Sequence, residues 1–313
     1  MVFTSSVKYK GLELSVKFPW KVGIVLFMAF PETLKGEKVL ESVEEIVSDD
    51  YFDVLEVPAY EGEVLRKIVK VAEERDVDVY LALQPEVLVY KANINSLDED
   101  ERKRAVERIK EKLNIAANAG IKNSAICSGP TVSPADSMKA KESLVKSFVE
   151  MLSEAEKLGM SLLLETFDVE YDKRLLIGPL REGAEVIRRL REEHGFKNTG
   201  LLWDLSHAPL LNEKPEDLKE FADVLSHIHI GCAKSTDEGL KDWHPGFYTP
   251  GAINTVEDVA KLIEVLYEIG YKGAISFEIK PEAQQTSLEV INASKGVLMQ
   301  AFNIFLRRRI LGE

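Results

Sequence analysis

Residues 200–211 read GLLWDLSHAPLL, an apolar run that carries an acid, Asp204, followed three residues later by His207. Short runs rich in leucine and β-branched residues are typical of buried strands. A carboxylate in such a run is costly to bury unless a partner compensates its charge. The stretch therefore indicates a buried strand whose last inward position faces a polar cavity.

Runs of this kind recur along the chain and alternate with longer stretches of helical periodicity. Residues 255–269, for example, place apolar side chains on one helical face after a capping Thr255 and before Gly270. Strands alternating with helices predict a parallel sheet, and eight units of roughly 30 residues fit a closed (β/α)₈ TIM barrel. The strand candidates are residues 22–30, 52–60, 77–85, 123–129, 161–168, 199–207, 225–232 and 273–281.

A doubly wound open sheet is the alternative fold. It usually carries a glycine-rich phosphate turn, and neither GxGxxG nor GxxxxGK[ST] occurs in this chain. Residues 1–20 alternate polar and apolar positions and could form a hairpin that plugs the floor of the barrel. Because no Pro/Gly-rich linker divides the chain, we expect residues 1–313 to form a single domain with this N-terminal extension.

The composition of the chain limits which kinds of binding partner and cell compartment are expected. The chain has 313 residues and a net charge of −13, which argues against a broad nucleic-acid or anionic-membrane surface. Cys127 and Cys232 are far apart, so a reducing cytoplasm is a simpler expectation than a disulfide framework. The N-terminus lacks a signal-peptide core, and the apolar run 22–30 is too short to span a bilayer. Dense Lys and Glu are typical of a thermophilic source, and a homo-oligomer is possible.

Four consecutive strand candidates end on potential metal ligands. These residues are Glu165, Asp204, His229 and Glu278, from strands five to eight. In TIM-barrel enzymes the chemistry lies at the C-terminal ends of the strands, so we expect these side chains to meet. If they point inward, their apolar neighbours such as Trp203 point outward to the helices, as strand alternation requires.

Three buried carboxylates repel one another unless a cation compensates them. Three oxygens and one imidazole suit Mn²⁺, Mg²⁺, Co²⁺, Fe²⁺ or Zn²⁺, and the sequence does not choose among these ions. His227 shares the inward face of His229 one layer deeper, where a hydrogen-bonded core histidine or a group supporting the ligands is the simpler interpretation.

The segments LLLETFD, LLWDLSH, HIHIGC, HPGFYTPGAIN and ISFEIKP occur in this order. With them the chain resembles the xylose isomerase-like barrel superfamily, which includes sugar isomerases and epimerases, inosose dehydratases and type IV apurinic endonucleases. The resemblance implies that Glu165, Asp204, His229 and Glu278 bind a metal. It also implies that His207 contacts the substrate, as the matching histidine does in sugar epimerases.

The segment DWH, Asp242 to His244, resembles a feature of the endonuclease branch. There it would bind a second metal together with His207. That branch also needs two earlier histidines, and in this chain no histidine precedes His194. The epimerase branch usually has an arginine shortly after its strand-seven histidine, where this chain has Lys234.

The first functional hypothesis is a divalent-metal-dependent isomerase or epimerase of a small sugar or related polyhydroxy carbonyl compound. Glu165 and Glu278 would transfer the proton through an enediol-type intermediate, and His207 would hydrogen-bond a substrate oxygen. The alternatives are a two-metal phosphodiesterase of the apurinic endonuclease type, a polyol dehydratase, and a barrel that binds without turnover. Further candidate contacts to the substrate are Lys234, Trp243, Lys241 and Lys280.

Overall fold

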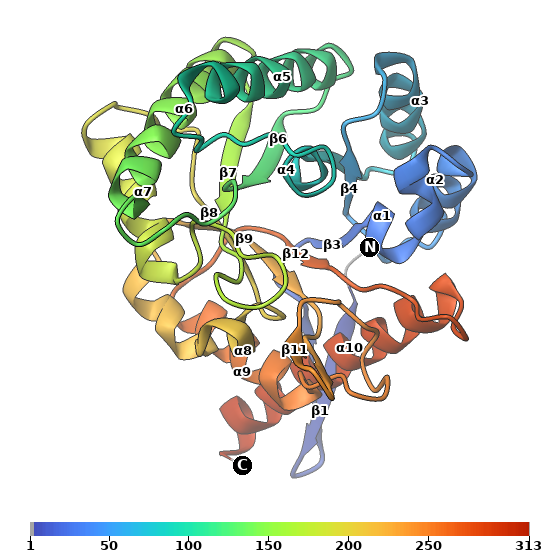
Figure 1. Ribbon diagram of the computed structural model, residues 1–313. Helices are drawn as coiled ribbons and strands as arrows, with labels where there is room; N and C mark the ends of the chain where they lie inside the picture. The colour runs from blue at the N-terminus through green and yellow to red at the C-terminus, as the bar shows by residue number, and fades with distance from the viewer. Residues whose placement is uncertain (1–2, 313) are drawn as a thin grey trace.

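The structure is a computed structural model that describes residues 3–312. Eight parallel strands close into a barrel in the order β12-β3-β4-β5-β6-β7-β8-β9, with the helices outside it, which confirms the predicted (β/α)₈ fold (Figure 1). The barrel strands are β3 (Val22–Val25), β4 (Val54–Pro58), β5 (Asp78–Ala82), β6 (Asn123–Cys127), β7 (Ser161–Glu165), β8 (Leu201–Asp204), β9 (Leu225–Ile230) and β12 (Ile275–Phe277).

The helices bury one apolar face against the barrel, as their periodicity predicts. In α9, Val259, Leu262, Ile263 and Leu266 are buried, and Thr255 closes a capping box at the first turn. The helical elements are α1 (Leu26–Ala29), η1 (Pro31–Lys35), α2 (Val39–Val47), α3 (Gly62–Glu73), α4 (Gln84–Leu88), α5 (Glu99–Asn118), α6 (Ser137–Lys157), α7 (Leu180–Glu192), α8 (Ala208–Leu211), η2 (Pro215–Phe221), α9 (Val256–Glu268) and α10 (Ser287–Leu311).

The strands are shorter than the apolar runs that predicted them. The first run was expected to be a strand over 22–30, and this is wrong beyond Val25, because residues 26–29 form α1. Barrel strands need only a few residues to complete their pairing. After the last paired residue the chain turns over the mouth of the barrel, where its apolar side chains are still covered, so hydrophobicity alone does not mark the end of the strand.

An antiparallel hairpin of β1 (Thr4–Tyr9) and β2 (Leu12–Lys17) precedes the barrel. It packs against α10, where Asn303 Nδ2 donates to Ser5 Oγ at 3.1 Å. A second small hairpin, β10 (Lys234–Thr236) and β11 (Gly239–Lys241), follows β9. Among the described residues, no helix is both long and apolar enough to cross a membrane.

The strand register places the candidate ligands at one end of the barrel. Asp204 on β8 pairs with His229 on β9, and His229 pairs with Ser276 on β12. Glu278 lies two residues beyond Ser276, so it points to the same face one step nearer the mouth. Glu165 is the last residue of β7. All four side chains therefore face the C-terminal mouth of the barrel.

Candidate metal centre

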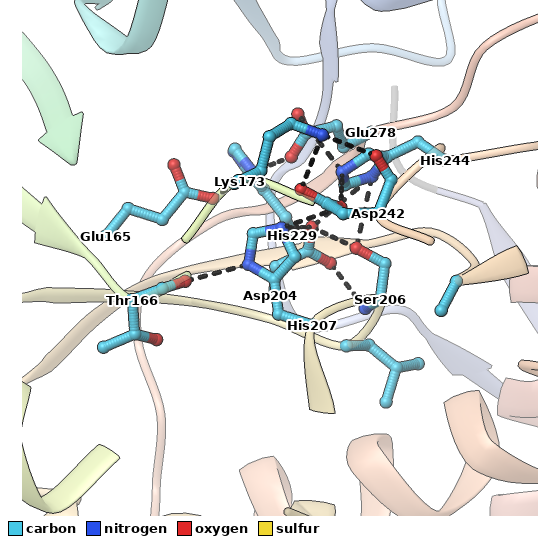
Figure 2. A network of polar contacts seen from close by, with 12 residues as sticks. Glu165, Thr166, Lys173, Asp204, Ser206, His207, His229, Asp242, His244 and Glu278 are labelled. Carbon is cyan, nitrogen blue, oxygen red and sulfur yellow. Dashed lines mark hydrogen bonds and ion pairs between the residues drawn. The ribbon is translucent and has the colours of Figure 1, made fainter. Parts of the chain in front are cut away.

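The side chains of Glu165, Asp204, His229 and Glu278, here called the quartet, converge at this mouth (Figure 2). One donor atom from each lies within 4.8 Å of the others, and all four residues are buried. His229 Nδ1 lies 2.7 Å from Glu278 Oε2 and 3.6 Å from Glu165 Oε1. Three oxygens and one nitrogen at this spacing could hold one divalent cation.

The hydrogen bonds of the quartet leave some of its oxygen atoms available as metal ligands. Glu165 Oε2 accepts from Gln84 Nε2 at 2.7 Å, whereas the buried Oε1 has no hydrogen-bond partner in the described part of the chain. Asp204 is held by Ser206, whose backbone N–H and hydroxyl donate to its two oxygens at 2.8 and 2.5 Å. A buried carboxylate oxygen without a partner is unfavourable, so these residues fit a bound cation.

Glu56 on β4 supports the quartet and was not predicted from the sequence. Its carboxylate lies 3.1 Å from His229 Nε2 and 2.7 Å from His227 Nε2. Because an ionised carboxylate only accepts, His229 Nε2 must donate, and its Nδ1 is left to face the quartet. His227 is the hydrogen-bonded core histidine that we expected. The missed signal is Glu56 itself, an acid in the middle of the apolar run VLEVP, and an acid in an apolar run is also what identified Asp204.

The buried charges shift one another's pKa. Burial raises the pKa of Glu56, but the attraction of His229 and His227 outweighs it and holds this pKa well below its usual range. Burial lowers the pKa of His229, yet Glu56 and Glu278 raise it well above its usual value. A cation at the quartet must therefore displace a proton from His229.

A second cluster lies beside the quartet and contains His207, Asp242 and His244. His244 Nε2 lies 2.6 Å and His207 Nε2 lies 3.3 Å from Asp242 Oδ1. His207 Nδ1 lies 2.8 Å from the carbonyl oxygen of Thr166, which can only accept, so Nδ1 carries a proton and Nε2 faces Asp242. Donor atoms of Asp204, His207 and His244 also lie within 4.8 Å of one another.

Lys173 also reaches this second cluster, and the sequence did not indicate it. Its ammonium lies 3.1 Å from Asp242 Oδ2, whereas the two histidines contact Oδ1 (Figure 2). Burial lowers the pKa of Lys173, but the attraction of Asp242 and Asp172 outweighs it, so the pKa is raised. Lys173 is therefore a fixed positive charge at this site.

A cavity of about 980 Å³ opens above both clusters. His229, Glu278, Asp242 and His244 line it, whereas His207 is buried deeper and packs against Phe167, with ring centroids 4.4 Å apart. The opposite wall is apolar and comes from α1, η1 and α4. Its side chains include Phe27, Met28, Leu34 and Leu88.

The predicted substrate contacts lie at different depths of this cavity. Lys234 and Trp243 line it, with Lys234 Nζ 5.3 Å from the Trp243 ring centroid and paired with Glu282. Lys280 also lines the cavity. Lys241 instead pairs with Glu238 on the β10–β11 hairpin, at 3.3 Å. The roles of all these residues stay predictions.

Several known proteins are similar to this chain. A curated relative, an uncharacterized protein of Methanocaldococcus jannaschii, is 26% identical over 138 residues, or 44% of this chain. The chain spans about half the length of that relative, 51%. The crystal structure of a D-tagatose 3-epimerase-like protein superposes with a TM-score of 0.71 at 19% identity, covering 92% of this chain and 99% of that one.

Two further solved structures share the fold. One is a D-psicose 3-epimerase crystallised with D-fructose, with a TM-score of 0.65, 18% identity, and 94% of this chain and 100% of that chain covered. The other, an IOLI protein with a zinc atom, has a TM-score of 0.67 and 17% identity, covering 91% of this chain and 99% of that one. The model of the family described as "Xylose isomerase-like TIM barrel" matches residues 41–294. This chain therefore belongs to the xylose isomerase-like TIM barrel family.

Proposed function

We propose that this protein is a divalent-metal-dependent isomerase or epimerase of a small sugar or related polyhydroxy carbonyl compound. One observation carries the proposal: Glu165, Asp204, His229 and Glu278 bring buried donor atoms within 4.8 Å of one another at the mouth of the barrel. Two of the four are glutamates, so the same cluster that binds the ion supplies a pair of groups for proton transfer.

The chain's own residues would divide the reaction as follows. The quartet would hold Mn²⁺, Mg²⁺, Co²⁺ or Zn²⁺, which when bound polarises adjacent carbonyl and hydroxyl oxygens of the substrate. Either Glu165 or Glu278 would take the proton next to the carbonyl, and the other would return it after an enediol-type intermediate. Lys234 and Trp243 would contact the substrate from the wall of the cavity, whereas the buried His207, which does not line the cavity, would orient Asp242.

The similar structures support this choice of reaction class. Two of them are described as a D-tagatose 3-epimerase-like protein and a D-psicose 3-epimerase, and a third carries a zinc atom. The net charge of −13 favours a small-molecule substrate over a nucleic acid. A polyol dehydratase could use the same two carboxylates and is the nearest alternative within this class.

A two-metal phosphodiesterase is the second candidate function. The contacts of Asp242 to His207 and His244, beside the quartet, favour it, because two neighbouring ions could stabilise the attacking and leaving oxygens of a displacement.

Replacing the two glutamates tests the proposed reaction. Glu165→Gln and Glu278→Gln should each lower kcat by about 10²–10⁴, since each removes a proton-transfer group without changing the volume of the side chain. The assay is exchange of the substrate C–H proton with deuterated water, followed by NMR over a panel of ketoses, hydroxypyruvate and inososes. Glu150→Gln, on the outer helix α6, is the control and should keep full exchange. Full activity in both Glu165→Gln and Glu278→Gln would refute the proposed proton transfer.

A further inference from the structure

The loop after β7 carries Lys173, and hydrogen bonds from the backbone of this loop fix the position of that residue. Asp168 is fully buried and its carboxylate accepts from the backbone N–H groups of Tyr171 at 2.6 Å and Lys173 at 2.9 Å. Leu175, just beyond, pairs with Pro130 as an isolated bridge. The backbone of Lys173 is therefore held by an ordered loop, so its side chain starts from a fixed point beside the second cluster.

The ammonium of Lys173 is held from three directions. It lies 3.1 Å from Asp242 Oδ2, 2.7 Å from the carbonyl oxygen of Asp242 and 3.2 Å from Asp172 Oδ2. The other oxygen of Asp172 accepts from the backbone N–H of Asp242 at 2.9 Å, which joins the two loops. The Lys173 side chain is 27% exposed, so water screens these contacts only in part.

Asp242 carries the charge that a second cation would need. Its Oδ1 is already shared by His207 and His244, and its Oδ2 by Lys173. A divalent ion bound to His207, Asp242 and His244 would lie within a few ångströms of the ammonium, in a buried site where like charges repel strongly. Asp242 and Asp172, the two carboxylates that contact the ammonium, would then face three positive charges with two negative charges.

We propose that Lys173 takes the place of a second metal ion in this protein, so that one divalent cation binds, at the quartet. His207 and His244 then face Oδ1 of Asp242, and the ammonium faces its Oδ2. This inference rests on the proposed role of the quartet as a metal site. It removes the two-metal arrangement on which the phosphodiesterase alternative depends, because an ammonium provides no open coordination position for water or a phosphate oxygen.

Counting bound metal tests the inference without an activity assay. The full-length protein is stripped with a chelator, dialysed against Zn²⁺ alone, and analysed for zinc per chain. We expect one ion in the wild type and two in Lys173→Met. Lys280→Met is the matched control, since it removes the same charge from the wall of the same cavity and should leave the count at one. Adding Asp242→Asn to Lys173→Met should return the count from two to one.

The outcomes separate this inference from the proposed function. A wild type with two ions, one of them lost in Asp242→Asn, overturns the role of Lys173 and leaves the quartet intact. A Lys173→Met protein that still binds one ion also overturns it. A wild-type ion that survives both His229→Ala and Glu165→Gln refutes the quartet instead, and a wild type without any ion refutes both. Circular dichroism checks folding, and Lys173→Gln gives the same count if Lys173→Met does not fold.

Discussion

At the scale of single residues, the centre depends on groups that orient the ligands as much as on the ligands. Gln84 fixes one oxygen of Glu165, and Glu56 fixes the ring of His229 through Nε2. Glu56 is 2% exposed, and both of the histidines that it contacts are buried as well. Removing the charge of such a group leaves a ligand free to rotate, which lowers metal affinity although no bond to the metal has been lost.

We therefore predict that Glu56→Gln weakens metal binding by about 10- to 100-fold. An amide keeps the size of the side chain but replaces an ionised acceptor beside two histidines. Isothermal titration of the stripped protein with Mn²⁺ or Zn²⁺ measures the effect. Glu213→Gln is the control, because Glu213 is another carboxylate that accepts two hydrogen bonds, from Leu180 N and Trp203 Nε1, although it is only partly buried. Equal affinities in the wild type and Glu56→Gln would contradict the orienting role.

At the scale of elements, the centre requires β9 and the chain after β12 to approach closely. Gly231 follows β9, and a Cβ atom added to it would lie 2.3 Å from the carbonyl oxygen of Glu278. Glu278 N also donates to the carbonyl of Ile230 at 3.0 Å. Only a residue without a side chain leaves room for this contact, which brings Glu278 to the quartet.

Gly231→Ala should destabilise the fold by about 1–3 kcal/mol, because the backbone of Glu278 must move. The same movement should lower metal affinity. Gly296→Ala on α10 is the matched change, since an added Cβ there meets no atom within 4 Å. It should raise stability by up to about 1 kcal/mol, as expected for alanine in a helix. Urea denaturation and metal titration measure both effects, and an unchanged midpoint in Gly231→Ala would rule out the tight contact.

At the scale of the whole molecule, the sequence predicted the repeated strand–helix units of the barrel and the ligand residues at the ends of its strands. The alternation of apolar runs and helical stretches predicted the barrel, and strand parity predicted that Asp204 and His229 share a face. Glu56, Gln84 and Lys173 were missed because none of them follows the strand-end pattern: Glu56 lies inside β4, Gln84 begins α4, and Lys173 lies in the loop between β7 and α7. The contact between His229 and Glu56 joins residues 173 positions apart. Only closure of the barrel, with β12 and β3 between them, brings β4 into contact with β9, and a single sequence does not reveal such a contact.

Metal removal should lower the stability of the whole barrel, because the quartet places three buried carboxylates close together. Burial raises the pKa of Asp204 although His207 and His244 act to lower it, so its negative charge is only partly compensated by the residues around it. An ion at 100 times its Kd should add about 2.7 kcal/mol to the free energy of unfolding, so that treatment with a chelator lowers Tm by several degrees. Asp204→Asn should lose this metal-dependent shift and, with one charge fewer, melt no lower than the stripped wild type. A wild-type Tm that is insensitive to Mn²⁺, Mg²⁺, Co²⁺ and Zn²⁺ would exclude the quartet as a metal site, because binding to the folded state alone must raise Tm.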